Sequence, residues 1–367
     1  RFYKHQPDLN VTNPDVRAEI RKIMGFWLAL GVSGFRVDAV PFLVEHKGIL
    51  AEDQPDPFDL LNEMHDFLAW RRAGAVLLAE ANISYDMADD YFGRGDRMSM
   101  IFDFTLNQQL MLSMVRGTAA SLRHALEHRP VAGGTGQWTN FLRSHDELSL
   151  ERLSIQEREE VYAAYGPQPE MQIYDRGIRR RLAPMFKGDL PRLKLAYSLL
   201  FALPGTPMLW YGEEIGMGED LSLEERNAVR TPMQWADEPN GGFSTAPPEQ
   251  LVRPMQEKGP FGYRAVNLSS QVRQPGSLVR EMAAMIACRR STPEIGWGKP
   301  EIIDVGDDDV LVLSYQWREG RVVTLHNFSG ASKTVNLTIE GVGRYAPILD
   351  MEDQSQPFPA TEPMKLE

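Results

Sequence analysis

Three acidic residues each follow a short, mainly apolar run of the chain. Asp38 and Glu80 come directly after such runs, and Asp146 closes the run that begins at Phe141. Parallel β-barrel enzymes build their active sites from residues at the C-terminal ends of the strands. We therefore expect the three carboxylates to meet at one end of a sheet, as nucleophile, proton donor and charge stabiliser.

The residues around Asp38 and Glu80 are expected to favour different protonation states, ionised for Asp38 and protonated for Glu80. Arg36 lies two residues before Asp38, so both side chains point to one face of a strand, and a guanidinium favours the ionised carboxylate that a nucleophile needs. Glu80 ends an aliphatic run, where desolvation favours the protonated form that a proton donor needs. Singly, Arg36–Asp38 is more typical of a structural ion pair and Glu80 of a loop residue. Together they match glycoside hydrolysis, with His145 and Asp146 suited to sugar hydroxyls.

The other polar patterns predict structure rather than chemistry. His124 and His128 are the one histidine pair at metal-ligand spacing, and we interpret them as the exposed C-terminal end of a helix, so no metal site is predicted. The basic cluster from Arg176 to Arg181 is interpreted as a salt-bridged helix end rather than a phosphate site. Cys288, the single cysteine, excludes an intramolecular disulfide and is expected to be a buried thiol in a helix.

Composition narrows the class of partner. The net charge of −12 argues against nucleic acid and against an anionic membrane surface, because both favour a basic face. No apolar stretch is long enough to span a bilayer, and the first residues lack the apolar core of a secretory signal. We therefore expect a cytoplasmic protein.

Helical and strand patterns alternate along most of the chain. Asn13, Pro14 and Asp15 predict a helix start, and an apolar face at helical spacing follows up to Gly31. The remaining expected helices cover residues 60–68, 118–127, 193–203 and 277–290, and the expected strands cover residues 34–37, 75–79, 100–104, 139–143 and 207–211. Strands separated by helices predict a parallel sheet. Five such strands fit either an open doubly wound sheet or part of an eight-stranded barrel whose other strands lie upstream.

The pattern changes near residue 298. Residues 334–339 alternate between apolar and polar, and residues 310–317 and 321–328 flank a short turn as a hairpin. We predict two domains: an α/β domain over residues 1–297 and a small antiparallel β-sandwich domain over residues 298–367.

Several motifs resemble those of glycoside hydrolase family 13, the α-amylase family. Residues 34–42 (GFRVDAVPF) resemble its nucleophile motif, residues 77–82 (LLAEAN) its acid/base motif, and residues 141–147 (FLRSHDE) its transition-state stabiliser motif. Residues 6–10 (QPDLN) resemble the motif of the oligo-1,6-glucosidase-like group. Residues 230–235 and 240–244 resemble the loop that follows the eighth strand in that group. The motifs occur in the family's order over nearly the whole chain.

The resemblance implies a role for each residue. Asp38 would be the nucleophile, Glu80 the acid/base and Asp146 the stabiliser, while Arg36 and His145 would bind the glycosyl unit. Arg230 and Phe243 are further candidates for substrate binding. Phe243 would either stack on a sugar face or pack within its loop. Three segments look closest to trehalose synthase: residues 141–150, 177–184 and 211–218. Ser144 stands where this family usually has Asn, and residues 46–57 differ from the trehalose synthase loop, so substrate choice stays open.

The resemblance also implies that the chain is the C-terminal part of a (β/α)8 TIM barrel, about strands 4 to 8, followed by the small β domain. In this family residues 6–10 follow the third strand, so we expect a missing N-terminal barrel segment as a partner of this chain. We expect no cofactor in the segment present, and calcium only in the upstream part.

The implied function is that of a retaining enzyme acting on small α-glucosides, either trehalose synthase-like, interconverting maltose and trehalose, or an α-glucosidase. The alternatives are a hydrolytic α-amylase or oligo-1,6-glucosidase acting on malto- or isomalto-oligosaccharides, and a non-catalytic fragment or binding protein.

Overall fold

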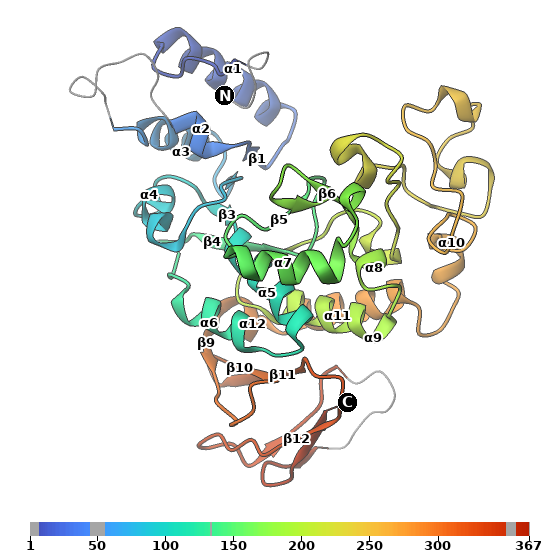
Figure 1. Ribbon diagram of the computed structural model, residues 1–367. Coiled ribbons are helices and arrows are strands. Elements are labelled where there is room, and N and C mark those ends of the chain that lie inside the picture. Colours follow the sequence, from blue (N-terminus) through green and yellow to red (C-terminus); the bar gives the residue numbers. More distant parts are fainter. Residues whose placement is uncertain (1–6, 45–55, 133, 350–356, 367) are drawn as a thin grey trace. The chain divides into compact units, whose positions relative to one another are not determined.

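The computed structural model describes residues 7–44, 56–132, 134–349 and 357–366. The chain separates into two compact units (Figure 1). The first comprises the described residues up to Thr105 together with residues 128–139, and the second comprises residues 106–127 and those from Asn140 onward. Gln6 of the QPDLN motif, His5, His46 and most of residues 46–57 lie outside the described residues.

A parallel sheet organises the strands that precede the predicted site residues. Its order is β1-β2-β3-β4-β8. The strand bounds are β1 Gly34–Val37, β2 Val76–Ala79, β3 Met100–Phe102, β4 Gln137–Phe141 and β8 Thr206–Met208. All five predicted strands are confirmed, although β3, β4 and β8 end earlier than predicted. Within the described residues the sheet does not close into a barrel.

Two of the helices in the first unit, α1 and α3, were predicted, and three short ones were not. Their bounds are α1 Pro14–Ala29, α2 Val40–Val44, α3 Asp59–Arg71, the 3₁₀ helix η2 Tyr85–Met87, and α4 Ala88–Phe92. The Asn13 side chain accepts a hydrogen bond from the Asp15 amide at 2.9 Å, which satisfies a free donor of the first turn of α1. The predicted apolar face of α1 is only partly buried: Met24 is in the core, whereas Ile23 and Trp27 are exposed.

The second unit contains most of the other helices. Their bounds are α5 Phe104–Arg116, α6 Ala120–His128, α7 Ile155–Tyr165, α8 Leu182–Met185, α9 Leu190–Ala202, α10 Leu268–Gln271, α11 Leu278–Ser291 and α12 Pro293–Trp297. Figure 1 shows α9 and α11 side by side, and their apolar residues join those of α5 in one core. The sequence analysis did not predict α5, most of whose residues are buried.

The basic cluster does not lie within a helix as expected; only Arg181 reaches a helix end, as the N-cap residue of α8. Residues 177–178 form strand β7, which pairs with β5 (Leu148–Ser149) and β6 (Gln172–Ile173). Extended backbone lets consecutive arginines reach separate carboxylates: Arg180 pairs with Glu219 at 2.8 Å and Arg181 with Glu213 at 3.2 Å. The salt-bridged character that was predicted is therefore present without the helix. Cys288 lies in α11 as predicted, but it is only partly buried.

The C-terminal strands pair in antiparallel fashion. The predicted hairpin is confirmed as β10 (Val310–Trp317) with β11 (Gly320–Asn327), and β9 (Lys299–Ile302) pairs with the other edge of β10. Two shorter pairs follow, namely β12 (Lys333–Val335) with β15 (Met364–Leu366) and β13 (Arg344–Tyr345) with β14 (Phe358–Pro359). Among the described helices, none has both the length and the apolar character needed to cross a membrane.

Candidate functional site

The pairing of β1 with β2 directs Asp38 and Glu80 to the same face. Arg36 lies opposite Leu78 in the register, and the Glu80 amide donates to the Val37 carbonyl at 2.9 Å just beyond the strand end. Asp38 lies two residues after Arg36, and Glu80 two residues after Leu78. Since side chains alternate along a strand, the two carboxylates belong to the face that carries Arg36.

One guanidinium nitrogen joins the two carboxylates. Arg36 Nη2 lies 2.9 Å from Asp38 Oδ1 and also donates to Glu80 Oε2. Two oxygens that contact one nitrogen lie within about 6 Å of each other, the sum of two hydrogen-bond lengths. Arg36 therefore contacts Glu80 as well as Asp38, because the parallel pairing of β1 with β2 brings Glu80 to the same guanidinium.

The two carboxylates differ in exposure as their sequence contexts suggested. The Glu80 side chain is 23% exposed and that of Asp38 is 69% exposed. The Ala39 amide also faces Glu80 Oε2, at 3.4 Å. Ala39 has φ 46°, a left-handed backbone that is uncommon for a residue with a Cβ, at the turn from β1 into α2. Such local strain is typical of functional sites.

Asp103 is a strand-end carboxylate that the sequence analysis missed. It follows β3 directly, is almost fully buried, and pairs with Arg129 at 2.8 Å. The Tyr85 hydroxyl donates to it at 3.1 Å, and burial together with the Asp103 charge raises the pKa of Tyr85. Asp103 carries the same signal as Asp38 and Glu80, an acid directly after an apolar run.

In the second unit, Asp146 lies among three cationic or polar side chains. Its Oδ1 atom is 2.5 Å from Arg230 Nη2 and 3.3 Å from Arg226 Nη1, and its Oδ2 atom is 3.5 Å from His145 Nε2. Arg230 Nε also donates to the His145 carbonyl at 2.7 Å. The structure thus brings together three predicted residues, Asp146, His145 and Arg230.

Arg226 is a member of this cluster that the sequence analysis missed. It lies in the 3₁₀ helix η5 (Glu225–Val229) and binds the Glu147 carboxylate with two nitrogens, at 2.6 and 3.1 Å. Burial disfavours its charge, but Glu147 and Asp146 outweigh this effect and raise the pKa of Arg226 above its ordinary value. The available signal was its position four residues before Arg230.

Aromatic residues lie beside part of this cluster. The His145 ring is 5.8 Å from the Trp210 ring, which in turn lies 4.3 Å from that of Tyr211. Phe243 directly follows the 3₁₀ helix η6 (Pro239–Gly242), and it is 51% exposed. No contact among the described residues joins Phe243 to Asp146.

A buried ion pair holds the segment that carries Arg230. Arg181 and Glu213 are almost inaccessible to solvent and lie 3.2 Å apart. Arg181 also donates to the carbonyls of Tyr211 at 2.8 Å and of Val229 at 2.9 Å. Burial raises the pKa of Glu213, while Arg181 and Arg143 oppose this. The contact to Val229 fixes the backbone directly before Arg230.

Among the described residues, one group of three side chains has a spacing suited to a metal ion, namely His124, Glu127 and His128 on α6. This group contains none of the carboxylates described above. As predicted, both histidines are exposed at the end of a helix.

Comparisons with known proteins agree with these motifs. The family model described as the α-amylase catalytic domain matches residues 1–161 and 178–298. Trehalose synthase of Thermus thermophilus is 38% identical over 99% of this chain and 38% of its own length. Trehalose synthase/amylase TreS of Mycobacterium tuberculosis is 37% identical over 95% of this chain and 59% of its own length. The chain therefore spans well under two thirds of these relatives.

Solved structures show the same fold at low sequence identity. The α-amylase from H. orenii matches with a TM-score of 0.68 at 20% identity, over 91% of this chain and 59% of that one. A variant of trehalulose synthase MutB matches with a TM-score of 0.72 at 21% identity, over 100% of this chain and 69% of that one. From its motifs, its parallel sheet and these matches, the chain belongs to the α-amylase family, and its fold is of the (β/α)8 type of that family's catalytic domain.

Proposed function

We propose that the protein containing this chain is a retaining enzyme acting on α-glucosides, of the trehalose synthase type. Asp38 attacks the anomeric carbon while Glu80 protonates the departing oxygen, which yields a β-glucosyl ester on Asp38 and a free sugar. Glu80 then removes the proton of the acceptor hydroxyl as that oxygen displaces Asp38. This double displacement needs no cofactor.

The observation that carries the proposal is the sharing of Arg36 by Asp38 and Glu80. Two carboxylates within about 6 Å fit the short spacing of retaining enzymes, because inverting enzymes need room for a water between theirs. Asp103, another strand-end acid of the described residues, is instead buried with a cation of its own.

The same contact supports the change of role that Glu80 must undergo. Before attack, the negative charge of Asp38 favours a protonated Glu80, the form that can act as an acid. Once Asp38 is an uncharged ester, that repulsion is gone and Arg36 remains beside Glu80. The guanidinium then favours the carboxylate, which is the form that acts as a base.

In the proposal, Asp146 stabilises positive charge on the glucosyl ring in the transition state. The two arginines that contact it, Arg226 and Arg230, hold its carboxylate in position. His145 would donate to sugar hydroxyls, and the exposed ring of Phe243 would stack on a sugar face.

Isomerisation and hydrolysis differ only in the acceptor of the second step. Trehalose forms when the released glucose is retained and attacks through its anomeric hydroxyl, whereas water gives glucose. We favour interconversion of maltose and trehalose because several relatives that match most of this chain are named trehalose synthases. Hydrolysis of malto- or isomalto-oligosaccharides is the second candidate, favoured by the similarity to Maltase A2 of Drosophila melanogaster.

The domain division is also proposed. Residues 1–297 would belong to the catalytic barrel and residues 298–367 to an antiparallel β-sandwich domain. From β9 onward the described strands pair only in antiparallel fashion, which supports this boundary.

The test is product analysis by NMR, using the protein that contains this chain and maltose as substrate. We expect trehalose as the main product, and glucose from any hydrolysis released first as the α-anomer. Asp38→Asn and Glu80→Gln should abolish turnover, and Asp86→Asn, at an exposed acid of the same unit, should not. Glucose as sole product would replace the isomerase proposal by the hydrolase one. Initial release of the β-anomer would refute the retaining mechanism, and no turnover of any α-glucoside would favour a binding protein.

A further inference from the structure

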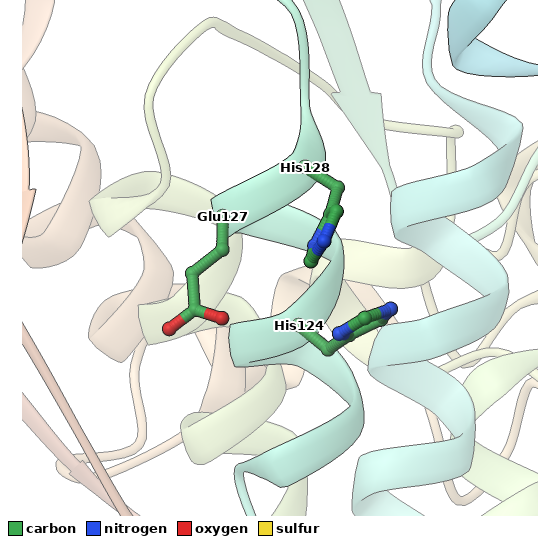
Figure 2. A group of neighbouring side chains, drawn as sticks. All are labelled: His124, Glu127 and His128. Carbon is green, nitrogen blue, oxygen red and sulfur yellow. The ribbon is translucent and has the colours of Figure 1, made fainter.

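The last turns of helix α6 present three potential metal ligands on the protein surface. His124, Glu127 and His128 are all exposed, and their ligand atoms lie within 4.8 Å of one another (Figure 2). We propose that these residues form a binding site for a divalent transition-metal ion, with zinc as the preferred ion. The site is separate from the carboxylates assigned to catalysis.

The spacing of the three residues follows from one helix. Side chains three and four residues apart are neighbours on a helix surface, and Glu127 and His128 stand at these distances from His124. Figure 2 shows all three projecting from the same helix. The arrangement therefore depends only on the continuity of α6.

The ligand types select the class of ion. Two imidazoles and one carboxylate are a set that zinc uses where three protein ligands leave a fourth position for water. Calcium and magnesium prefer oxygen ligands, and this group offers a single carboxylate. Donor atoms about 2 Å from a tetrahedral ion lie about 3.4 Å apart. The side chains must therefore approach each other by little more than about 1 Å, which exposed rotamers allow.

The order of the residues provides a second argument. Residues 124–128 read HALEH, which is the H-x-x-E-H order of a class of zinc peptidases in which both imidazoles bind the ion. In those enzymes the site is catalytic. Here all three residues are exposed, so the structure supports binding of an ion and not peptide hydrolysis.

A bound ion would connect the two final turns of α6. Arg129, the next residue, forms the buried pair with Asp103 at 2.8 Å. Ion binding should therefore slow hydrogen exchange of the amides near the end of α6, a local effect that an ion bound elsewhere would not produce.

The experiment is calorimetric titration of the metal-free protein that contains this chain with zinc chloride, with cobalt chloride as a spectroscopic probe. We expect one site per chain and visible absorption bands of imidazole-coordinated cobalt. His124→Ala and His128→Ala should each weaken zinc binding by at least about tenfold, because each removes one of three ligands. Glu127→Gln should weaken it less, because the amide keeps an oxygen but loses the charge.

Matched controls lie on other helices of the chain. His65→Ala on α3 and Glu159→Gln at an exposed position of α7 should leave zinc binding unchanged. Circular dichroism verifies that each variant is folded. The proposal is overturned if the wild-type chain binds no zinc, or if the His124→Ala/His128→Ala double variant binds it as tightly. Unchanged affinity of Glu127→Gln would overturn the three-ligand set.

Discussion

At the scale of single residues, the decisive contact is the sharing of Arg36 between Asp38 and Glu80. Identical residue types occur at other strand ends with different consequences. Asp103 also follows a strand, yet it is buried and paired with Arg129. A carboxylate at a strand end can therefore act in catalysis only where its surroundings leave it accessible to a substrate.

Replacing Arg36 by lysine tests this contact. An ammonium group is a point charge on a flexible stem and cannot hold two carboxylates as the planar guanidinium does. We expect kcat/KM on maltose to fall by about 10²-fold or more, with little change in melting temperature because Arg36 is partly exposed. Arg94→Lys, at an exposed position of the same unit, is the control. Wild-type kinetics for Arg36→Lys would contradict the assigned role.

At the scale of elements, short segments depend on a few specific contacts. The 3₁₀ helix η5 carries Arg226, and Arg230 follows it directly. The hydrogen bond that Arg181 donates to the Val229 carbonyl fixes the backbone of this segment. Regular helices instead depend on their caps, as α7 shows with Ser154 and Glu157.

Arg181→Met should damage both stability and function. It leaves the Glu213 carboxylate buried without its ion-pair partner, which costs about 3–5 kcal/mol of unfolding free energy. Adding Glu213→Leu should restore much of the stability, because a well-packed apolar pair can replace a buried ion pair. Activity should remain low in the double variant, since Val229 stays unanchored. Urea denaturation and maltose turnover measure the two effects, and full activity of the double variant would refute the positioning role.

Ser154→Ala should weaken α7 alone. Ser154 Oγ accepts from the Glu157 amide at 3.3 Å, and the Glu157 carboxylate accepts from the Ser154 amide at 3.0 Å. Losing this capping box should lower the unfolding free energy by about 1 kcal/mol, measured by urea denaturation. Glu159→Gln, exposed in the same helix, should change it by less than about 0.5 kcal/mol. An equal loss in both variants would speak against the cap.

At the scale of the whole molecule, the hairpin β10–β11 is joined to the helical core of the second unit by polar contacts. His326 of β11 is buried, and its Nε2 atom lies 3.0 Å from Ser198 Oγ on α9. The Tyr315 hydroxyl of β10 donates to the Ala202 carbonyl at 2.6 Å. These contacts make the hairpin part of the same folded body as α9.

Lowering the pH should reduce the free energy of unfolding through protonation of His326. Burial lowers the pKa of His326 from 6.5 to about 4. The unfolded chain therefore binds a proton near pH 6.5 that the folded chain binds only near pH 4, so unfolding takes up a proton within this window. Stability should fall as the pH is lowered from 6.5 to 4, by up to about 3 kcal/mol from this group.

The check is urea denaturation across that pH range. His326→Gln can still form a hydrogen bond with Ser198, and it should remove this group's contribution to the slope of unfolding free energy against pH. His124→Gln, at an exposed position, should leave that slope unchanged. A slope unchanged in His326→Gln would assign the acid sensitivity to other groups.

The local sequence by itself determined much of the framework. Strand positions, the start of α1 at Asn13 and the hairpin after Val310 all follow from neighbouring residues, because caps, turns and alternation act over a few positions. The family motifs also placed Asp38, Glu80 and Asp146 as candidates. Several elements escaped this reasoning, among them the helices α5 and α7 and the extended arginines before α8.

Only the tertiary structure decided which arginine contacts which carboxylate. Arg36 and Glu80 are 44 positions apart, and Asp146 and Arg230 are 84 apart. Which cation meets which carboxylate depends on strand register and on how distant loops return to the sheet, and no local pattern encodes either. The sequence therefore determined which residues can do chemistry, whereas long-range packing decided that Arg36 serves two acids and that Arg226 joins Asp146.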